Sequence, residues 1–170
     1  MKRLFFALWP DTAVRQQCFE LVKAGAIPGQ PVAFDNLHLT LVFLGNLEPD
    51  RQAALMTLAD RLLVEPMTVC LDRLSLWQDC LVCCSRTDAI DPALARLAEQ
   101  LKAAARGIGL QPDARRVIPH ITLIRQVNRG LFAMTETAIS PIVFNSRQFC
   151  LLESRFTEGT VKYQIVKVWR

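Results

Sequence analysis

Long apolar runs are absent from this 170-residue sequence. No stretch approaches the roughly 20 consecutive apolar residues that a membrane-spanning helix needs. At the N-terminus the apolar run covers only Leu4 to Trp9 before Pro10 and Asp11 end it, whereas a secretory signal needs about 7–15 such residues. We therefore expect a cytoplasmic protein that has no membrane as a partner.

Low-complexity tracts and long runs of charge are absent as well. Hydrophobic residues make up 51 % of the chain, which excludes an intrinsically disordered protein. The length suits one domain, or two small intertwined lobes. The formal net charge of +4 is a weak indication of a polyanion or a phosphate ester as a partner.

The six cysteines do not form a complete metal-binding pattern. In the cytoplasm they should be reduced thiols that pack as small hydrophobic side chains. Only Cys80, Cys83 and Cys84 are spaced like a chelate, but alternation in a strand places Cys80 and Cys84 on one face and Cys83 on the other. Because no second pair or spare histidine completes the ligand set, we expect no metal and no other cofactor.

Hydrophobic periodicity predicts an α+β protein. One helix should begin after Asp91, a capping residue that is followed by Pro92 at the first helical position. The turn between the last two strands is expected near Glu158 and Gly159. Strands are predicted at 3–9, 37–44, 67–76, 80–85, 119–125, 141–152 and 160–169, helices at 10–25, 48–66 and 88–109, and a loop at 27–36.

Histidine occurs only twice, at His38 and His120, and both lie in the same local sequence. "NLHLTLVFLG" and "PHITLIR" each place threonine two residues after the histidine and leucine three residues after it. From composition alone, this coincidence has a probability of about 7 in 100,000. The two motifs are 82 residues apart and each ends the order strand, helix, loop, strand. We therefore predict a single domain over 1–170 with an internal repeat, whose two lobes pack about a pseudo-two-fold axis.

The repeated motif carries a specific chemistry. Residues i and i+2 of a strand share a face, so His38 lies beside Thr40 and His120 beside Thr122. Two imidazoles on opposite sides of a phosphate can act as acid and base without a metal, and the hydroxyls can donate to its non-bridging oxygens. The alternatives are two structural histidines, or a metal site, for which threonine is a weak ligand.

These motifs resemble those of the two-histidine phosphoesterase superfamily, and within it those of the bacterial and archaeal RNA 2',3'-cyclic phosphodiesterases, also called 2'-5' RNA ligases. The resemblance runs from "RLFFALWP" at the N-terminus to "YQIVKVW" at 163–169. It implies a bilobal α+β fold with two pseudo-symmetric lobes. Each lobe would have an antiparallel sheet and flanking helices, with a cleft between the lobes.

The resemblance also implies an activity and residue roles. The reaction would be hydrolysis of a 2',3'-cyclic phosphate on RNA or a nucleotide to a 2'-phosphomonoester, with 2'-5' joining of RNA ends as its reverse. His38 would be the proton donor to O3', and His120 would be the proton acceptor for water. Thr40 and Thr122 would hold the phosphate. The roles of the two histidines exchange in the joining direction.

Arginine and phenylalanine residues supply further candidates. Arg125 matches an arginine of the subfamily's second motif, but strict alternation places it on the face opposite His120. It would then reach the cleft only past the end of the strand, to bind a base or a phosphate, or remain solvated. Exposed loop arginines can follow an RNA backbone, and phenylalanines can stack on bases or fill a core. The candidates for these roles are Arg115, Arg116, Phe5 and Phe6.

Two other functions fit the same residues. One is a non-catalytic module that binds RNA ends or nucleotides. The other keeps the phosphodiesterase chemistry but acts on 2'-5' oligoadenylates or on an ADP-ribose cyclic phosphate. In each case we expect a monomer.

Overall fold

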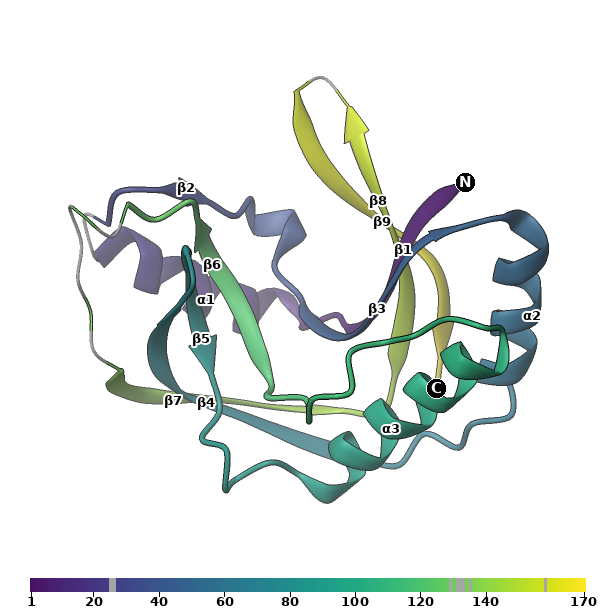
Figure 1. Ribbon diagram of the computed structural model, residues 1–170. Coiled ribbons are helices and arrows are strands. Elements are labelled where there is room, and N and C mark those ends of the chain that lie inside the picture. The colour runs from purple at the N-terminus through teal and green to yellow at the C-terminus, as the bar shows by residue number, and fades with distance from the viewer. Residues whose placement is uncertain (25–26, 129, 131–133, 135, 158) are drawn as a thin grey trace.

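The computed structural model describes residues 1–24, 27–128, 130, 134, 136–157 and 159–170 (Figure 1). Its helices are α1 (Thr12–Ala24), α2 (Pro49–Ala59) and α3 (Pro92–Gly107), with a short 3-10 turn, η1 (Phe34–Asn36). Its strands are β1 (Lys2–Leu8), β2 (Gln30–Pro31), β3 (Leu39–Leu47), β4 (Met67–Trp77), β5 (Cys80–Cys84), β6 (His120–Arg125), β7 (Thr137–Ser146), β8 (Phe149–Thr157) and β9 (Thr160–Trp169).

The strands form two antiparallel halves that meet in the middle of the molecule. The order is β7-β4-β5-β6-β3-β1-β8-β9, with β2 paired to the edge of β6. β3 and β6 are joined only through Leu39 and Ile121 among the described residues. Each half therefore has four main strands, and its innermost strand carries one of the two motifs. This arrangement confirms the predicted bilobal α+β class and adds the single residue pair that links its two sheets.

Helices α1 and α3 each contact the half-sheet that does not contain the strand before them in the chain. α1 lies between β1 and β3 in the chain but packs against β6 and β7. α3 lies between β5 and β6 in the chain but packs against β3 and β4, with α2 alongside it (Figure 1). The lobes are therefore intertwined: α1 follows β1 but covers the half that contains β6 and β7, and α3 bridges β4 of its own half and β3 of the other.

Both long helices begin beside a capping aspartate, and that of α3 is the one predicted from the sequence. Asp11 Oδ1 accepts a hydrogen bond from the Val14 amide at 2.9 Å at the start of α1. Asp91 Oδ1 accepts one from the Ala93 amide at 2.7 Å, and its Oδ2 accepts one from the Thr68 amide at 2.9 Å. Pro92 occupies the first turn of α3, where its missing N–H costs nothing. The Asp91 carboxylate thus caps α3 and ties it to β4.

Alternate residues of β1 enter two different apolar clusters. Leu4, Phe6 and Leu8 are buried in the main core, which the helices cover. Phe5 belongs to a smaller cluster on the opposite face with Cys150 and Leu152. Phe6 is therefore a core residue, whereas Phe5 lies on the face that forms the cleft.

Several predicted boundaries were wrong. The strand expected at 141–152 is instead the end of β7 and the start of β8. A turn separates them, in which Ser146 Oγ donates to the Gln148 carbonyl at 2.8 Å. Pro141 is tolerated inside β7 because this is an edge strand. The helix predicted at 48–66 ends at Ala59, and η1 forms within the loop predicted at 27–36.

The remaining differences concern the strand ends. The strand predicted at 37–44 begins at Leu39, just after His38, and continues to Leu47. Gly159 has a φ of +76°, which is suited to the expected hairpin turn. Glu158, the other residue of that predicted turn, lies outside the described residues. Within the part of the chain described here, no helix is long and apolar enough to cross a membrane.

Candidate active site

His38 is fixed by hydrogen bonds on both of its ring nitrogens. Nδ1 donates to the backbone carbonyl of Asn36 at 2.6 Å. Nε2 lies 3.0 Å from the hydroxyl of Thr40. With Nδ1 protonated, the Nε2 of a neutral imidazole is an acceptor, so the Thr40 hydroxyl donates to it. Nε2 is therefore the nitrogen that can take up or release a proton.

The Nδ1 atom of His120 is held in the same way as that of His38. Its Nδ1 donates to the backbone carbonyl of Ile118 at 2.8 Å, as that of His38 does to the carbonyl two residues before it. Its ring lies 4.7 Å from the ring of Trp77, measured between centroids. The two motifs thus fix the same tautomer, with Nδ1 protonated in each ring and Nε2 left as the acceptor.

The two motifs cross at the junction of the half-sheets. Leu39 and Ile121 are partners in an antiparallel pair, and each directly follows its histidine. Counted outward from this pair, the register places His38 across from Thr122 and Thr40 across from His120. Each motif therefore has its histidine and its threonine within one residue of the pair that links the half-sheets.

A β-bulge turns Arg125 toward the site. In the pairing of β5 with β6, Val82 is opposite Thr122 and Leu81 is opposite Ile124, so Leu123 is an extra residue. Both Leu123 and Ile124 are buried as a result, and the following arginine returns to the face of His120. Strict alternation was therefore wrong for Arg125, because the bulge shifts the pattern by one residue.

The first motif has the same bulge. Phe6 is opposite Val42 and Ala7 is opposite Thr40, so Leu41 is the extra residue on β3. Phe43 consequently returns to the face of His38, and it is 66 % exposed there. Phe43 and Arg125 each follow their histidine by five residues, and they occupy equivalent positions in the two lobes.

Burial and positive charge lower the pKa of both imidazoles. The pKa of His38 falls to about 4, mainly because the ring is buried; the Asn36 carbonyl partly opposes this, and the charges of Arg125 and His120 add to it. The pKa of His120 is lowered by burial first and then by Arg125, against the opposing bond to the Ile118 carbonyl. Both rings are therefore neutral at pH 7 when no anion is bound.

Aromatic rings enclose His38. Its ring centroid lies 4.9 Å from that of Phe5 and 4.8 Å from that of Tyr163, in edge-on contact. Trp9 lies nearly parallel to the imidazole, at 6.4 Å. These contacts leave only 7 % of His38 exposed, which is why burial dominates its pKa.

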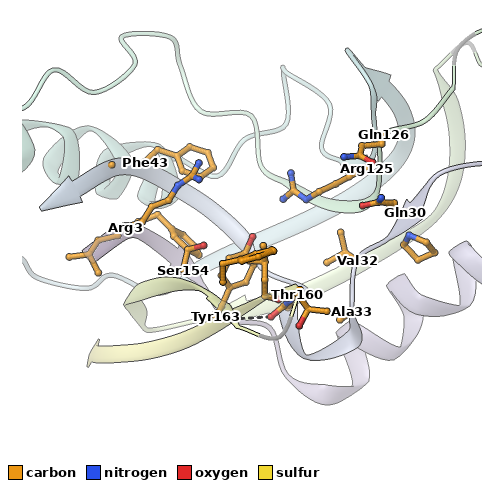
Figure 2. Close-up of a pocket in the computed structure, with 18 residues that line it drawn as sticks. Arg3, Gln30, Val32, Ala33, Phe43, Arg125, Gln126, Ser154, Thr160 and Tyr163 are labelled. Atoms are coloured by element: carbon orange, nitrogen blue, oxygen red, sulfur yellow. Dashed lines mark hydrogen bonds between the residues drawn. The ribbon is translucent and has the colours of Figure 1, made fainter. Parts of the chain in front are cut away.

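A cavity of about 710 Å³ adjoins the histidines (Figure 2). Its volume is within the range of roughly 300–1,000 Å³ that is usual for small-molecule sites. His38 and His120 are not in its wall, but Phe5, Asn36 and Tyr163, which contact His38, are. Arg125 projects into it from β6, as Figure 2 shows. The cavity is therefore large enough for a nucleotide, and it ends beside the residues that enclose His38.

Comparison with known proteins gives this site a family. A family model described as LigT like phosphoesterase matches residues 8–81. The RNA 2',3'-cyclic phosphodiesterase of Escherichia coli (strain K12) is 33 % identical over 174 residues, which covers 99 % of this chain and 96 % of that protein. This chain belongs to the LigT-like phosphoesterases.

Solved structures agree with this assignment. The crystal structure of E. coli LigT complexed with 3'-AMP superposes with a TM-score of 0.87 at 31 % identity, over 99 % of this chain and 97 % of that one. A protein of Thermus thermophilus, TT0787, superposes with a TM-score of 0.81 at 23 % identity, over 98 % of this chain and 96 % of that one, and it supports the fold alone. The family predicted from the two motifs is confirmed, and this LigT-like phosphoesterase is a phosphodiesterase.

In this LigT-like phosphoesterase, the loop arginines predicted to follow an RNA backbone lie apart from the cavity. Arg115 and Arg116 are not among its lining residues. The Arg115 guanidinium pairs with Asp113, with Nε 2.9 Å from Oδ2, and Lys102 Nζ donates to the Arg115 carbonyl at 2.6 Å. Within the described part of the chain, no three His, Cys, Asp or Glu side chains are grouped as metal ligands would be, and the six cysteines are free thiols.

Sequence reasoning missed three residues of this site. Asn36, Phe43 and Tyr163 all line the cavity. Asn36 and Phe43 lie within the quoted segment "NLHLTLVFLG", so their nearness to the motif was the available signal. Tyr163 is brought to His38 only by the pairing of β9 with β8, which the sequence around it does not reveal.

Proposed function

We propose that this protein hydrolyses the 2',3'-cyclic phosphate at RNA ends or on nucleotides to a 2'-phosphomonoester, with His38 and His120 as the acid and base. The observation that carries the proposal is the crossing of the two motifs at Leu39 and Ile121. It brings together two imidazoles whose Nδ1 atoms are both bonded to backbone carbonyls. The RNA 2',3'-cyclic phosphodiesterase activity in the name of the E. coli relative supports it.

The reaction follows from the positions of these groups. Nε2 of His120 takes a proton from the attacking water as the new phosphorus–oxygen bond forms. Nε2 of His38 gives a proton to O3' as the phosphorus–O3' bond breaks, which leaves the phosphate on O2'. Thr40, Thr122 and Arg125 hold the non-bridging oxygens, where negative charge develops. In 2'-5' joining a 5'-hydroxyl attacks in place of water and the phosphorus–O3' bond again breaks, so His120 and His38 keep these roles. The exchange of roles expected from the sequence applies to cleavage of a 2'-5' bond, in which O3' attacks and the 5'-oxygen leaves.

Substrate binding itself prepares His38 to act as the acid. The lowered pKa values keep both rings neutral in the free enzyme, which suits His120 as a base. A cyclic phosphate carries a negative charge, and a nearby opposite charge raises the pKa of an imidazole. The anion therefore favours the protonated form of His38 where a proton is needed.

The test is hydrolysis of a nucleoside 2',3'-cyclic phosphate, with the product identified by chromatography. We expect turnover to the 2'-phosphate, and a loss of at least ~100-fold in kcat in both His38→Ala and His120→Ala. Thermal unfolding of each variant checks that the fold is retained. Near-normal rates in both folded variants would overturn the proposal, and tight binding without turnover would indicate a nucleotide-binding module instead.

Parallel assays decide the substrate class. Comparison of RNA ends with 2'-5' oligoadenylates and an ADP-ribose cyclic phosphate separates the proposed function from the same chemistry on another diester. We further propose that the enzyme acts as a monomer in the cytoplasm; its free thiols support a reducing compartment. Sedimentation of the purified protein tests the first point, and cell fractionation tests the second.

A further inference from the structure

We infer that the β8–β9 hairpin, together with Arg3, binds the RNA chain that precedes the nucleotide with the cyclic phosphate. RNA ends would then be better substrates than free nucleotides. The inference rests on the proposed function and extends it from the reacting phosphate to the body of the substrate.

The hairpin is placed to extend the site. Figure 1 shows β8 and β9 projecting beyond the rest of the sheet, beside the N-terminal end of β1. Phe156 on β8 and Val161 on β9 are partners near the tip, and both line the cavity. Phe156 is 76 % exposed. Since the same cavity reaches Tyr163 and Asn36 beside His38, the hairpin surface is continuous with the catalytic residues.

The strand register defines a path across this surface. Arg3 on β1 is opposite Ser154 on β8, and Ser154 is opposite Tyr163 on β9. These three side chains form a row on the cleft face, and all of them line the cavity (Figure 2). Phe156 follows Ser154 by two residues and so lies on the same face, one step farther out. The path from His38 thus passes Tyr163 and Ser154, with Arg3 beside Ser154 on β1, and reaches the exposed ring of Phe156.

The chemistry along this path matches single-stranded RNA. Among the described residues the cavity is lined by two arginines, Arg3 and Arg125, and by no aspartate or glutamate. Arg3 has no ion pair with any residue that the structure describes. A cationic groove with exposed aromatic rings is the usual surface for single-stranded nucleic acid, because phosphates bind the cations and bases stack on the rings. Charge complementarity therefore favours an RNA chain over a second protein.

The test compares two substrates that carry the same reacting group, a 2',3'-cyclic phosphate. The first is a nucleoside 2',3'-cyclic phosphate, and the second is an unstructured oligoribonucleotide with the same cyclic end. The measured quantity is the ratio of kcat/KM for the oligonucleotide to kcat/KM for the nucleotide. We expect Phe156→Ala to lower this ratio about tenfold, the size expected for one lost base stack. Phe156→Trp should retain it, because the ring remains available for stacking.

Arg3→Ala tests the phosphate contact. We expect this variant, too, to have a lower ratio of kcat/KM for the oligonucleotide to kcat/KM for the nucleotide. The slope of log affinity for the oligonucleotide against log salt should decrease in magnitude by about 0.7, the value for one lost phosphate contact to a single strand. Leu63→Ala and Arg61→Ala are matched controls, because Leu63 is 85 % exposed, Arg61 is exposed, and neither lines the cavity. Both control ratios should equal that of the unmodified protein.

The outcomes separate the two proposals. Turnover of both substrates with an unchanged ratio in Phe156→Ala and Arg3→Ala would overturn this inference and leave the proposed function intact. If neither substrate is turned over, the proposed function fails, and binding of the labelled oligonucleotide then tests the surface alone. Weaker binding in Phe156→Ala would support the surface, and equal binding would overturn it. An altered sedimentation coefficient with an unchanged ratio would identify an interface between copies and also overturn it.

Discussion

Asn36 links the imidazole of His38 to the backbone of β9 at Val161 and Tyr163. The backbone carbonyl of Asn36 accepts the Nδ1 proton of His38 at 2.6 Å. Its side-chain Nδ2 donates to the Val161 carbonyl at 2.6 Å, and its Oδ1 accepts from the Tyr163 amide at 3.2 Å. One side chain thus pairs with β9 much as a neighbouring strand would, and holds the tyrosine ring against the histidine.

Substitution of Asn36 should lower both the stability of the protein and its kcat. We expect Asn36→Ala to lower the free energy of unfolding by about 1–2 kcal/mol, because two hydrogen bonds are lost. It should also lower kcat, since Tyr163 is no longer held against the His38 ring, although the backbone carbonyl that accepts from Nδ1 remains. Asn36→Asp keeps an acceptor for the Tyr163 amide, so its kcat and its free energy of unfolding should lie between those of Asn36→Ala and those of the unmodified protein. Unchanged kcat in a destabilised Asn36→Ala would mean that the residue only docks the hairpin.

The lowered pKa of His38 predicts a pH-dependent stability. An unfolded imidazole binds a proton near pH 6.5, whereas the buried ring of His38 does so only near pH 4. Between these values the unfolded state holds more protons, so the free energy of unfolding must decrease as the pH falls. The decrease for this residue should total up to about 3 kcal/mol.

Denaturant unfolding from pH 7 to pH 4 measures this effect. Carboxyl groups titrate in the same window, so the comparison is with His38→Gln, in which the curve should be flatter. Parallel curves for the two proteins would contradict the assigned pKa. Addition of a nucleoside 2'-phosphate should raise the pKa of His38 in an NMR titration, because the bound anion favours the charged ring.

Arg125 should affect both the substrate and the histidines. Its positive charge lowers the pKa of His38 and of His120, so Arg125→Ala should raise both values. Loss of its charged hydrogen bonds to the phosphate should raise KM about tenfold. Arg125→Lys keeps the charge without the two-pronged geometry, so it should restore the pKa values more fully than KM. NMR titration and steady-state kinetics measure the two effects separately.

The threonine hydroxyls should contribute more to the transition state than to binding. Thr40→Val and Thr122→Val replace a hydroxyl by a methyl group of similar size, and each should lower kcat about 100-fold with a smaller change in KM. Thr40→Ser and Thr122→Ser keep the hydroxyl and serve as controls. Equal losses in the serine variants would assign the effect to packing instead of hydrogen bonding.

The parts predicted from the sequence were those that depend on local pattern. The two motifs could be recognised because His38 and His120 have nearly identical neighbours and no other histidine competes with them. The start of α3 was correct because Asp91 and Pro92 are a local capping signal. In both cases the determining residues lie within a few positions of one another.

The parts that could not be predicted depend on pairing between distant strands. The bulges at Leu41 and Leu123 exist only relative to β1 and β5, so nothing in "HLTLVF" or "HITLIR" alone reveals that the alternation shifts. The turn between β7 and β8 contains neither glycine nor proline, and it was therefore read as continuous strand. Neither the orientation of Arg125 nor the boundary of β8 could be read from single segments.

The packing of α1 and α3 across the two halves limits how far the lobes can separate when a substrate enters. To widen the gap between the lobes, α1 would have to leave β6 and β7 while β1 holds its N-terminal end. α3 would have to leave β3 while β5 and β6 hold its two ends. We therefore expect a preformed cleft that does not open by a hinge motion between the lobes. The spacing of its acid and base is set once, when the polypeptide folds.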